Sequence, residues 1–448
     1  MKGYNDDGKK YVGDAIKNGA IAIVLEDGTN VKELEIPENT TVFLAKDIRA
    51  CLAKMSCNFY SNPSKEFTLI GVTGTKGKTT TTYMIKHILE KEGKKVGLIG
   101  TIATYIGEEK IENSDRTTPE STKIQKLFRK MADEKVDVVV MEVSSQSLML
   151  HRVDYCDFDI GVFTNLSEDH ISEKEHKNMQ EYFEEKLKLF NMCKIGFTNA
   201  DDIYTSKLKK LVPNCNIMTY GIDNHCDYLA KDITITNSYA DFKARLGDRN
   251  ERIKVGIPGR FSVYNGLAAI CVTQKLGATK ESIKDALLTI RVPGRSEIVE
   301  NKRELTIMID YAHTPESLEN ILKAVKEYTR GRVISVFGCG GDRDRNKRHL
   351  MGEISGRIAD VSIITSDNPR TEKPEAILDE IENGIKKTKG KYIRIENRKE
   401  AIRKAISMAN KMDIIVIAGK GHEMYQEIGN EKIPFDERKV IKEIIDNM

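Results

Sequence analysis

The chain has 448 residues and a formal net charge of +3, a length that exceeds what one hydrophobic core usually supports and predicts two or three domains. Basic and acidic residues are interspersed and no apolar run approaches the roughly 20 residues that cross a bilayer, so we expect neither nucleic-acid binding nor membrane insertion. The start of the chain has no apolar signal core and the eight cysteines form no C-x-x-C pair, which favours a cytoplasmic protein with reduced, mostly buried thiols.

Apolar runs alternate with segments of helical periodicity along most of the chain. We predict helices, in which apolar residues recur every three or four positions, over 79–92, 178–191, 315–328, 374–386 and 397–410. We predict strands over 67–72, 95–101, 136–142, 158–165, 194–199, 305–310, 332–338, 361–366, 391–396 and 413–419. This alternation is typical of the α/β class with mainly parallel sheets.

Two irregular stretches divide this pattern. The sequence SNPSKEF at 61–67 ends a short leading segment, and RVPGRSE at 291–297 separates two long α/β blocks. Proline, glycine and serine in such stretches interrupt regular structure. We therefore predict an N-terminal domain of residues 1–66, a central domain of residues 67–293 and a C-terminal domain of residues 294–448.

A glycine-rich turn, GVTGTKGKTT at 71–80, lies between a predicted buried strand and a predicted helix. A helix N-terminus offers free backbone N–H groups and a positive dipole end to phosphate. In phosphate loops a lysine reaches the terminal phosphates and the next hydroxyl binds Mg²⁺, which assigns these roles to Lys78 and Thr79. Val72 replaces the first glycine of the usual motif, whereas Gly74 and Gly77 still allow close approach of the backbone. The alternative is a glycine-rich turn without a ligand.

Two further polar side chains follow predicted strands. The strand over 136–142 ends in Glu142, and the strand over 158–165 is followed by LSEDH, which contains His170. Metals and ligands bind at the carboxyl ends of parallel strands. Glu142 and His170 are therefore candidate metal ligands, with a surface histidine as the alternative for His170.

The order of motifs along the chain resembles that of the Mur ligases. These motifs are GTKGKTT, TTPES, MEVSSQSL, FTNLSEDH, GRFSVYN, VPGRSE, DYAHTP, GCGGDRD, DNPR and GKGHE, and the resemblance covers almost the whole chain. It implies a three-domain architecture: an N-terminal domain that binds a UDP-linked substrate, a central P-loop ATPase domain with a mainly parallel sheet, and a C-terminal Rossmann-like domain that binds an amino acid.

The family builds the peptide of bacterial cell-wall precursors with ATP. The resemblance implies that ATP phosphorylates a carboxylate, that an amine attacks the acyl phosphate, and that ADP and phosphate are released. TTPES, DYAHTP, GGDRD and DNPR are similar to the branch that adds meso-diaminopimelate to the D-glutamate γ-carboxylate of UDP-N-acetylmuramoyl-L-alanyl-D-glutamate in peptidoglycan synthesis. Such chemistry depends on positioning and charge neutralisation more than on a protein nucleophile.

The resemblance also implies the residues that bind ATP and metal. The ATP-binding positions are Gly74, Thr75, Lys76, Gly77, Lys78, Thr79, Thr80, Asn265, Arg295, Asp310, Tyr311 and His313. They lie in both the central and the C-terminal domain, which implies domain closure during the reaction. The catalytic positions are Lys78, Glu142, His170 and Lys186, and Mg²⁺, expected as a pair of ions, would be held by Thr79, Glu142, His170 and a carbamylated Lys186. From the residues alone, Lys186 is one of several lysines on a solvated helix.

For the UDP-muramoyl-dipeptide, the positions that match the family are Thr117, Thr118, Ser144 and Arg152. The two threonines and Ser121 precede a helix, where hydroxyls and N–H groups can hold phosphate or carboxylate, although a simple helix cap is the alternative. Two residues depart from the family pattern, because Gln146 replaces a histidine and Leu150 replaces a residue that is often polar.

For the amino acid, the matching positions are Arg343, Asp367, Asn368, Arg370, Gly419 and Glu423. DNPR follows a predicted strand and brings Arg370 to its end, where a forked guanidinium suits the distal carboxylate of meso-diaminopimelate. Glu423 would accept hydrogen bonds from the distal ammonium. The alternative for Arg370 is a surface ion pair.

The chain begins about one strand and one helix later than members of the family usually do, so we expect a truncated N-terminal domain with weak affinity for the UDP-linked substrate. Three other functions remain open: a lysine-adding enzyme of the same family, a folylpolyglutamate synthase and a non-catalytic nucleotide-binding module. The presence of Lys78, Thr79, Glu142, His170 and Lys186 argues against the module. We expect a monomer.

Overall fold

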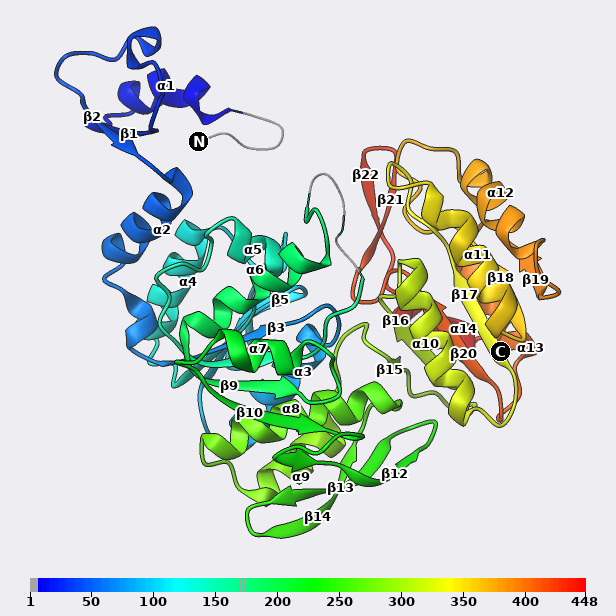
Figure 1. Ribbon diagram of the computed structural model, residues 1–448. Coiled ribbons are helices and arrows are strands. Elements are labelled where there is room, and N and C mark those ends of the chain that lie inside the picture. The colour runs from blue at the N-terminus through cyan, green and yellow to red at the C-terminus, as the bar shows by residue number, and fades with distance from the viewer. Residues whose placement is uncertain (1–6, 169–170, 172–174) are drawn as a thin grey trace. The chain divides into compact units, whose positions relative to one another are not determined.

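The computed structural model (Figure 1) describes residues 7–168, 171 and 175–448. The chain divides into two compact units. One unit comprises the chain up to Lys78 together with Gly93–Thr219, and the other comprises Thr79–Glu92 together with Tyr220–Met448.

The leading segment of the first unit contains one parallel pair of strands, β1 (Ala22–Glu26) and β2 (Thr41–Ala45). Helix α1 (Val12–Lys17) precedes the pair and α2 (Ile48–Phe59) follows it. Asp47 caps α2, because its carboxylate accepts hydrogen bonds from the first backbone N–H groups of that helix. Three 3-10 turns complete the segment: η1 (Gly8–Tyr11), η2 (Val31–Leu34) and η3 (Pro63–Lys65).

The central sheet has the strand order β11-β10-β9-β8-β3-β7-β4-β5-β6. Its strands are β3 (Thr68–Thr73), β4 (Val96–Ile99), β5 (Ala103–Ile106), β6 (Glu109–Asn113), β7 (Val138–Glu142), β8 (Phe158–Phe163), β9 (Cys193–Asn199), β10 (Asn216–Gly221) and β11 (Tyr228–Leu229). Strand β3 pairs in parallel with both β7 and β8. The carboxyl ends of these three strands therefore lie at one edge of the sheet.

The inner strands are uniformly apolar because both faces of a parallel sheet are covered. All of β7 is buried, including Glu142 at its end. Besides α1 and α2, the first unit contains α4 (Ser121–Asp133), α5 (Ser145–Met149), α6 (Met179–Asn191) and α7 (Thr205–Leu211). At the far edge, β5 and β6 form an antiparallel hairpin that the sequence pattern did not predict.

In the second unit, helix α3 (Lys78–Lys91), from Thr79 onward, contacts an α-helical pair, α8 (Arg260–Lys275) and α9 (Lys280–Thr289). Thr81 donates a hydrogen bond to Asn265 at 3.4 Å, and Glu92 accepts one from the backbone N–H of Thr279 at 2.8 Å. The same unit contains an antiparallel sheet of three strands, β12 (Lys231–Ile235), β13 (Ala240–Leu246) and β14 (Arg249–Val255).

The C-terminal part of the second unit contains a sheet of order β15-β16-β20-β17-β18-β19, parallel except for β15. Its strands are β15 (Glu297–Ile298), β16 (Thr306–Asp310), β17 (Val333–Phe337), β18 (Val361–Ile364), β19 (Lys391–Arg394) and β20 (Ile414–Ala418). The accompanying helices are α10 (Pro315–Tyr328), α11 (Asn346–Ile358), α12 (Pro374–Ile385), α13 (Arg398–Met408) and α14 (Glu437–Asp446).

Two hydrophobic clusters cover the two faces of this sheet. Along β16, Met308 belongs to the cluster that includes α10, α11 and α12, whereas Ile307 and Ile309 belong to the cluster that includes α13 and α14. This alternation follows from the two-residue period of a strand. A short hairpin, β21 (Tyr425–Ile428) and β22 (Glu431–Pro434), follows β20. The predicted α/β class with mainly parallel sheets is confirmed.

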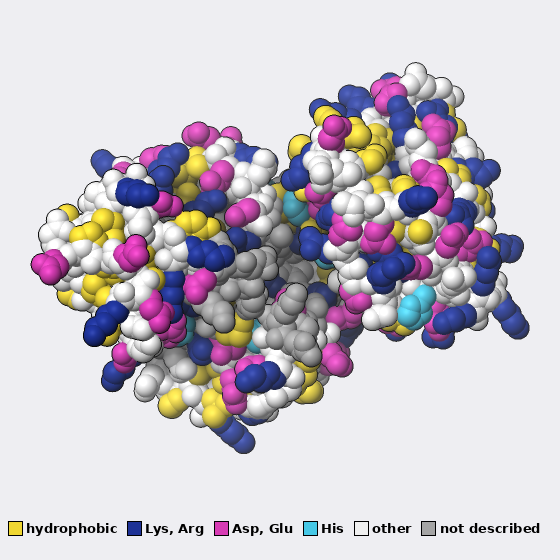
Figure 2. Space-filling model, turned by 90° about the horizontal axis from the view of Figure 1, so that it is seen from above, with side chains coloured by type: hydrophobic (Ala, Val, Ile, Leu, Met, Phe, Trp, Pro, Cys, Tyr) yellow, Lys and Arg dark blue, Asp and Glu magenta, His cyan; other side chains and the backbone are white. Residues whose placement is uncertain are grey.

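Surface and composition agree with the expectations from the sequence. In Figure 2, basic and acidic side chains are interspersed over the visible face without a continuous field of one sign. All eight cysteines are free thiols and six of them are buried. Among the described residues, none of the helices has the length and hydropathy needed to cross a membrane.

Candidate active site

The phosphate loop connects the end of β3 to the start of α3, as the motif predicts. Gly74 has φ +148° and Gly77 has φ +86°, values that L side chains rarely adopt. A Cβ atom on Gly74 would also overlap the hydroxyl oxygen of Thr164. Glycine at position 74 is therefore required by both the backbone conformation and the neighbouring strand end.

The residues that follow β8 hold this loop in place. The side-chain oxygen of Asn165 accepts from the backbone N–H of Lys76 at 2.9 Å, and its backbone oxygen accepts from the N–H of Thr75 at 2.9 Å. Thr164 donates from its hydroxyl to the backbone oxygen of Lys76 at 2.7 Å. The first residues of the motif FTNLSEDH thus fix the shape of the phosphate loop through hydrogen bonds within the protein.

Two lysine side chains meet at one carbonyl oxygen of the loop. The ammonium nitrogen of Lys78 donates to the backbone oxygens of Gly74 at 2.8 Å and Thr75 at 3.0 Å. The ammonium nitrogen of Lys186, on α6, donates to the same oxygen of Gly74 at 3.0 Å. Lys186 is only 2% exposed, and its nitrogen lies 4.4 Å from the ring centre of Tyr182. The structure therefore brings two of the predicted catalytic residues to the loop.

Glu142 is fully buried at the end of β7 and its carboxylate is fixed by a neighbouring loop. The backbone N–H and the hydroxyl of Thr101 donate to its two oxygens at 2.8 and 3.0 Å. Gly100 is needed beside it, since a Cβ there would overlap the carboxylate. Carboxylate oxygens such as those of Glu142 are ligands that a hard cation such as Mg²⁺ prefers.

Thr79 and His170 are the other two residues predicted to bind metal with unmodified side chains. Thr79 is buried in the first turn of α3, next to the buried Thr80. His170 lies outside the described residues. Within 7–168, 171 and 175–448, no group of three or more histidine, cysteine and acidic side chains could hold a metal ion. The donor set that remains, a buried carboxylate and a hydroxyl, has the oxygen chemistry that Mg²⁺ prefers.

The four residues predicted to bind the muramoyl-dipeptide form a connected group. Thr117 and Thr118 precede α4, Ser144 caps α5 and Arg152 follows α5. The hydroxyl of Thr118 lies 3.3 Å from that of Ser144 and accepts from the Ser144 backbone N–H at 3.1 Å. Arg152 donates to the backbone oxygen of Thr118 at 3.2 Å, and burial lowers the pKa of its guanidinium. Thr117 reaches Thr101 at 3.1 Å, which connects this group to Glu142.

His176 belongs to the same region and was not predicted. It is 1% exposed, and its Nε2 lies 2.8 Å from the hydroxyl oxygen of Ser145. Its ring packs against Tyr182 with centroids 4.9 Å apart, and the Tyr182 hydroxyl lies 3.2 Å from that of Thr75. The only sequence signal is its position in EHKN, shortly after the motif that contains His170.

In the C-terminal part, the DYAHTP motif follows β16. Asp310 accepts from the backbone N–H groups of Ser296 at 2.8 Å and Ala312 at 2.9 Å, and burial raises the pKa of its carboxyl. The guanidinium of Arg295 lies 4.9 Å from the ring centre of Tyr311. His313 packs against Tyr311, and its Nδ1 lies 2.7 Å from the Tyr311 backbone oxygen. The structure thus groups four of the predicted ATP-binding residues, while Asn265 lies on α8.

The predicted amino-acid site is assembled at the carboxyl ends of β18 and β20. Asn368 donates from its amide nitrogen to Glu423 at 2.9 Å. Gly419, with φ +119°, lies against Asp367, since a Cβ there would overlap the Asp367 carboxylate. Asp367 and Asn368 are buried and Glu423 is half-buried.

Arg370 and Arg343 approach the Gly340 turn after β17. Arg370 donates from Nε to Glu427 at 2.9 Å and from Nη1 to the backbone oxygen of Gly341 at 2.8 Å. A Cβ on Gly340 would lie 3.0 Å from Arg370 Nη1 and 3.8 Å from Arg343 Cγ. Arg370 therefore makes an ion pair with Glu427, and its Nη2 donates to no described residue.

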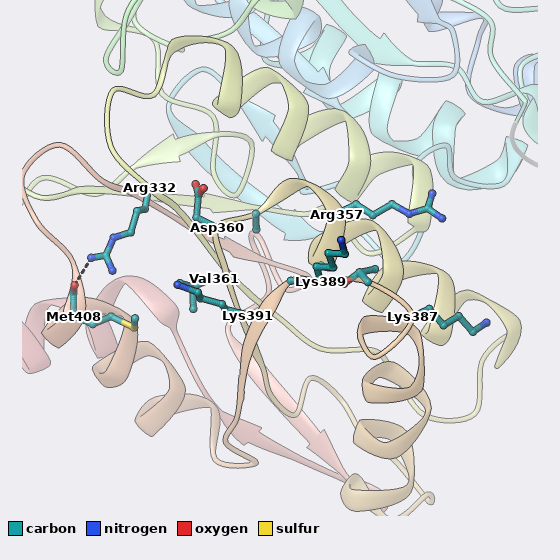
Figure 3. A pocket seen from close by; sticks show the side chains of 12 residues that line it. Arg332, Arg357, Asp360, Val361, Lys387, Lys389, Lys391 and Met408 are labelled. Atoms are coloured by element: carbon teal, nitrogen blue, oxygen red, sulfur yellow. Dashed lines mark hydrogen bonds between the residues drawn. The ribbon is translucent and has the colours of Figure 1, made fainter.

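One cavity among the described residues lies away from these groups. It has a volume of about 850 Å³ and opens where β17, β18 and β19 begin, with Arg332, Asp360 and Lys391 on its wall (Figure 3). Arg332 is held by the backbone oxygen of Met408 at 2.6 Å and by Asp413 at 2.7 Å. Ligands of open α/β sheets bind at the carboxyl ends of the strands. This cavity is at the amino ends, so it is no candidate for the active site.

Comparison with known proteins agrees with this geometry. Residues 72–273 match the Mur ligase middle domain, and residues 294–421 match the Mur ligase glutamate ligase domain. Over 446 residues the chain is 51% identical to the UDP-N-acetylmuramoyl-L-alanyl-D-glutamate--2,6-diaminopimelate ligase of Caldanaerobacter subterraneus subsp. tengcongensis, covering 99% of this chain and 91% of the relative. The chain belongs to the Mur ligase family.

Other Mur ligases extend the comparison. The ligase of the same name from Clostridium botulinum is 48% identical over 449 residues, covering 99% of this chain and 91% of the relative. A solved structure of a ligase with that name aligns with a TM-score of 0.71 at 30% identity, covering 98% of this chain and 89% of that one. Mur ligases are ATP-dependent enzymes that form an amide, so the chain is an enzyme of this kind.

Proposed function

We propose that this Mur ligase adds meso-diaminopimelate to the D-glutamate γ-carboxylate of UDP-N-acetylmuramoyl-L-alanyl-D-glutamate, as a cytoplasmic monomer in peptidoglycan synthesis. The observation that carries the proposal is the grouping of Asn368, Arg370 and Glu423 at the carboxyl edge of the C-terminal sheet. A guanidinium and a carboxylate in one site would suit the zwitterionic end of the entering amine. Relatives named for this reaction are 51% and 48% identical.

In the proposed reaction, a γ-carboxylate oxygen attacks the terminal phosphorus of ATP and ADP leaves, which yields an acyl phosphate. The amine nitrogen then attacks the acyl carbon, loses a proton, and phosphate leaves as the amide forms. Both steps move negative charge among oxygens, so electrostatic stabilisation and alignment supply most of the catalysis. The contact of the Lys78 ammonium with the Gly74 oxygen supports this, because it places a cation at the loop.

ATP would be bound by the phosphate loop, residues 74–80, and by Asn265, Arg295, Asp310, Tyr311 and His313. Glu142, Thr79 and His170 would hold Mg²⁺, which when bound neutralises phosphate oxygens. The buried carboxylate of Glu142, held by Thr101, supports this assignment. We assign the domains to residues 1–66, 67–293 and 294–448.

Lys186 would be the fourth metal-binding group, as a carbamate. In that modification the ammonium first loses a proton, the lone pair of the neutral amine then forms a bond to the carbon of CO₂, and a second proton leaves the nitrogen, so a cation becomes an anion. Burial of Lys186 and its contact with the loop support the assignment, because a modified side chain there would be shielded from water.

The muramoyl-dipeptide would be bound by Thr117, Thr118, Ser144 and Arg152, and the amine by Arg343, Asp367, Asn368, Arg370, Gly419 and Glu423. The hydrogen bonds within each group support these assignments. The test is phosphate release from ATP in the presence of the UDP-linked dipeptide and either meso-diaminopimelate or L-lysine. We expect release only with both substrates and a strong preference for meso-diaminopimelate; a preference for lysine would refute the proposed substrate.

A further inference from the structure

Lys420 is a charged side chain in the amino-acid site that neither the motif assignments nor the proposed reaction uses. It lies in the turn after β20, between Gly419 and Gly421, and is 0% exposed. Its ammonium nitrogen lies 2.7 Å from Asn368 Oδ1, 3.3 Å from Glu423 Oε2 and 4.0 Å from Asp367 Oδ1. A fully buried lysine is uncommon and requires partners such as these.

Lys420 decides which way the amide of Asn368 faces. Asn368 Oδ1 accepts from the ammonium of Lys420 and from the backbone N–H of Glu427 at 3.0 Å. Both groups are pure donors, so the oxygen of the amide must face them and its nitrogen must face the other way. The amide nitrogen consequently donates to Glu423 Oε2 at 2.9 Å.

The two carboxylate oxygens of Glu423 differ in their contacts. Oε2 accepts from both Asn368 and Lys420. Oε1 accepts no hydrogen bond from any described residue, and the side chain is 21% exposed. One carboxylate oxygen is thus held by the protein while the other is presented to solvent.

The charges around Lys420 are unbalanced in a way that favours a cationic ligand. Arg398 pairs with Glu437 at 2.7 Å, and Asp367 lies 4.0 Å from both Arg398 and Lys420. These two cations therefore face three carboxylates, those of Asp367, Glu423 and Glu437. The remaining negative charge is available at Glu423, where an entering ammonium would be attracted.

We propose that Lys420 is a positioning residue of the amino-acid site: through Asn368 it fixes Glu423 so that Oε1 faces the ammonium of the entering amine. This role rests on the proposed function. Lys420 itself needs no contact with substrate, because its effect passes through Asn368 Oδ1 and Glu423 Oε2.

The test is steady-state kinetics of Lys420→Met, with the concentrations of amine, ATP and UDP-linked dipeptide varied in turn. Loss of charged hydrogen bonds should raise KM for meso-diaminopimelate by roughly 10- to 100-fold. KM for ATP and for the dipeptide should stay within about twofold, and Lys420→Arg should recover part of the loss, since it keeps donors and charge. The matched control is Lys442→Met, which changes an exposed lysine on α14.

A second comparison separates positioning from general damage. Asn368→Asp removes the amide that donates to Glu423 Oε2. Because Lys420 donates to the same oxygen, adding Lys420→Met to Asn368→Asp should raise KM for the amine much less than Lys420→Met does in the wild-type protein. If Lys420→Met does not fold, Lys420→Gln replaces it in both backgrounds. An unchanged KM for the amine, equal changes in all three KM values, or additive effects would overturn the role of Lys420. Wild-type protein that does not use meso-diaminopimelate would overturn the proposed function as well.

Discussion

The buried ammonium nitrogen of Lys186 donates a hydrogen bond to the backbone oxygen of Gly74, 3.0 Å away. This contact ties helix α6 to the phosphate loop across 112 positions of sequence. Lys78 reaches the same oxygen, so a change in the charge of Lys186 acts directly on the loop. Both its burial and its position argue that Lys186 contributes to catalysis rather than to solubility.

Replacing Lys186 by methionine should therefore nearly abolish turnover. We expect kcat to fall by at least about 100-fold, the effect typical of removing a group that stabilises developing charge. Excess bicarbonate should give no recovery, because the variant has no amine to carry a carbamate. The control is Lys188→Met on the same helix, a partly exposed lysine paired with Glu185, which should stay within about twofold of wild type. Full activity of Lys186→Met would rule out the carbamate assignment.

Gly74→Ala should disrupt the phosphate loop more than other glycine replacements at positive φ. The added Cβ would overlap the Thr164 hydroxyl, so strain and steric overlap together should cost roughly 2–4 kcal/mol of stability. Gly93→Ala is the control, because Gly93 also has positive φ but faces open space, and strain alone should cost roughly 1–2 kcal/mol. Thermal unfolding and ATP hydrolysis measure the difference. Equal destabilisation by both changes would contradict the packing argument.

Arg370→Met should weaken selection of meso-diaminopimelate over lysine. The guanidinium is held by Glu427 and Gly341, so its fork is oriented before substrate enters. We expect KM for meso-diaminopimelate to rise by roughly 10- to 100-fold, with little recovery in Arg370→Lys, since an ammonium lacks the fork. Arg357→Met, on the exposed side of α11, is the control. If Arg370→Met still prefers meso-diaminopimelate to lysine, another residue binds the distal carboxylate.

His313 should make stability depend on pH, although the residue is exposed to solvent. Desolvation by the groups packed around its ring, Tyr311 among them, lowers the pKa of its imidazole below the ordinary value of 6.5. As pH falls below about 6.5, the unfolded chain takes up a proton that the folded protein does not, so folding loses free energy until the lower folded pKa is reached. The fall in Tm from pH 7.5 to 5.5 should be smaller in His313→Gln than in wild type. His225→Gln, at an exposed position, should leave the fall unchanged, and an equal fall in all three proteins would contradict the argument.

The fold was predictable where strands are buried on both faces. Strand β20 is uniformly apolar and β7 is apolar up to Glu142 at its end, and their burial in a parallel sheet explains that composition. Strand β14, of sequence RNERIKV, carries four charged residues because one of its faces is exposed, and the antiparallel sheet that contains it was missed. The β5–β6 hairpin was missed for the same reason, since β6 is largely exposed.

The candidate site was predictable where chemistry follows a strand end, as with Glu142 and Asp367. Lys186 was selected only through the family resemblance, since its burial cannot be read from a helix rich in lysine. Lys420 was missed although it stands inside the GKGHE motif, because its role depends on Asn368, 52 positions away in sequence. Pairing over such distances is decided by the fold and leaves no local pattern.

The central claim is that this chain joins meso-diaminopimelate to the D-glutamate γ-carboxylate at the expense of ATP. The most direct measurement is identification of the product by mass spectrometry, together with phosphate release, in mixtures that lack one substrate at a time. We predict one phosphate per amide formed, with both signals absent when either the UDP-linked dipeptide or the amine is omitted. Phosphate release that is indifferent to both substrates, without an amide product, would contradict the account.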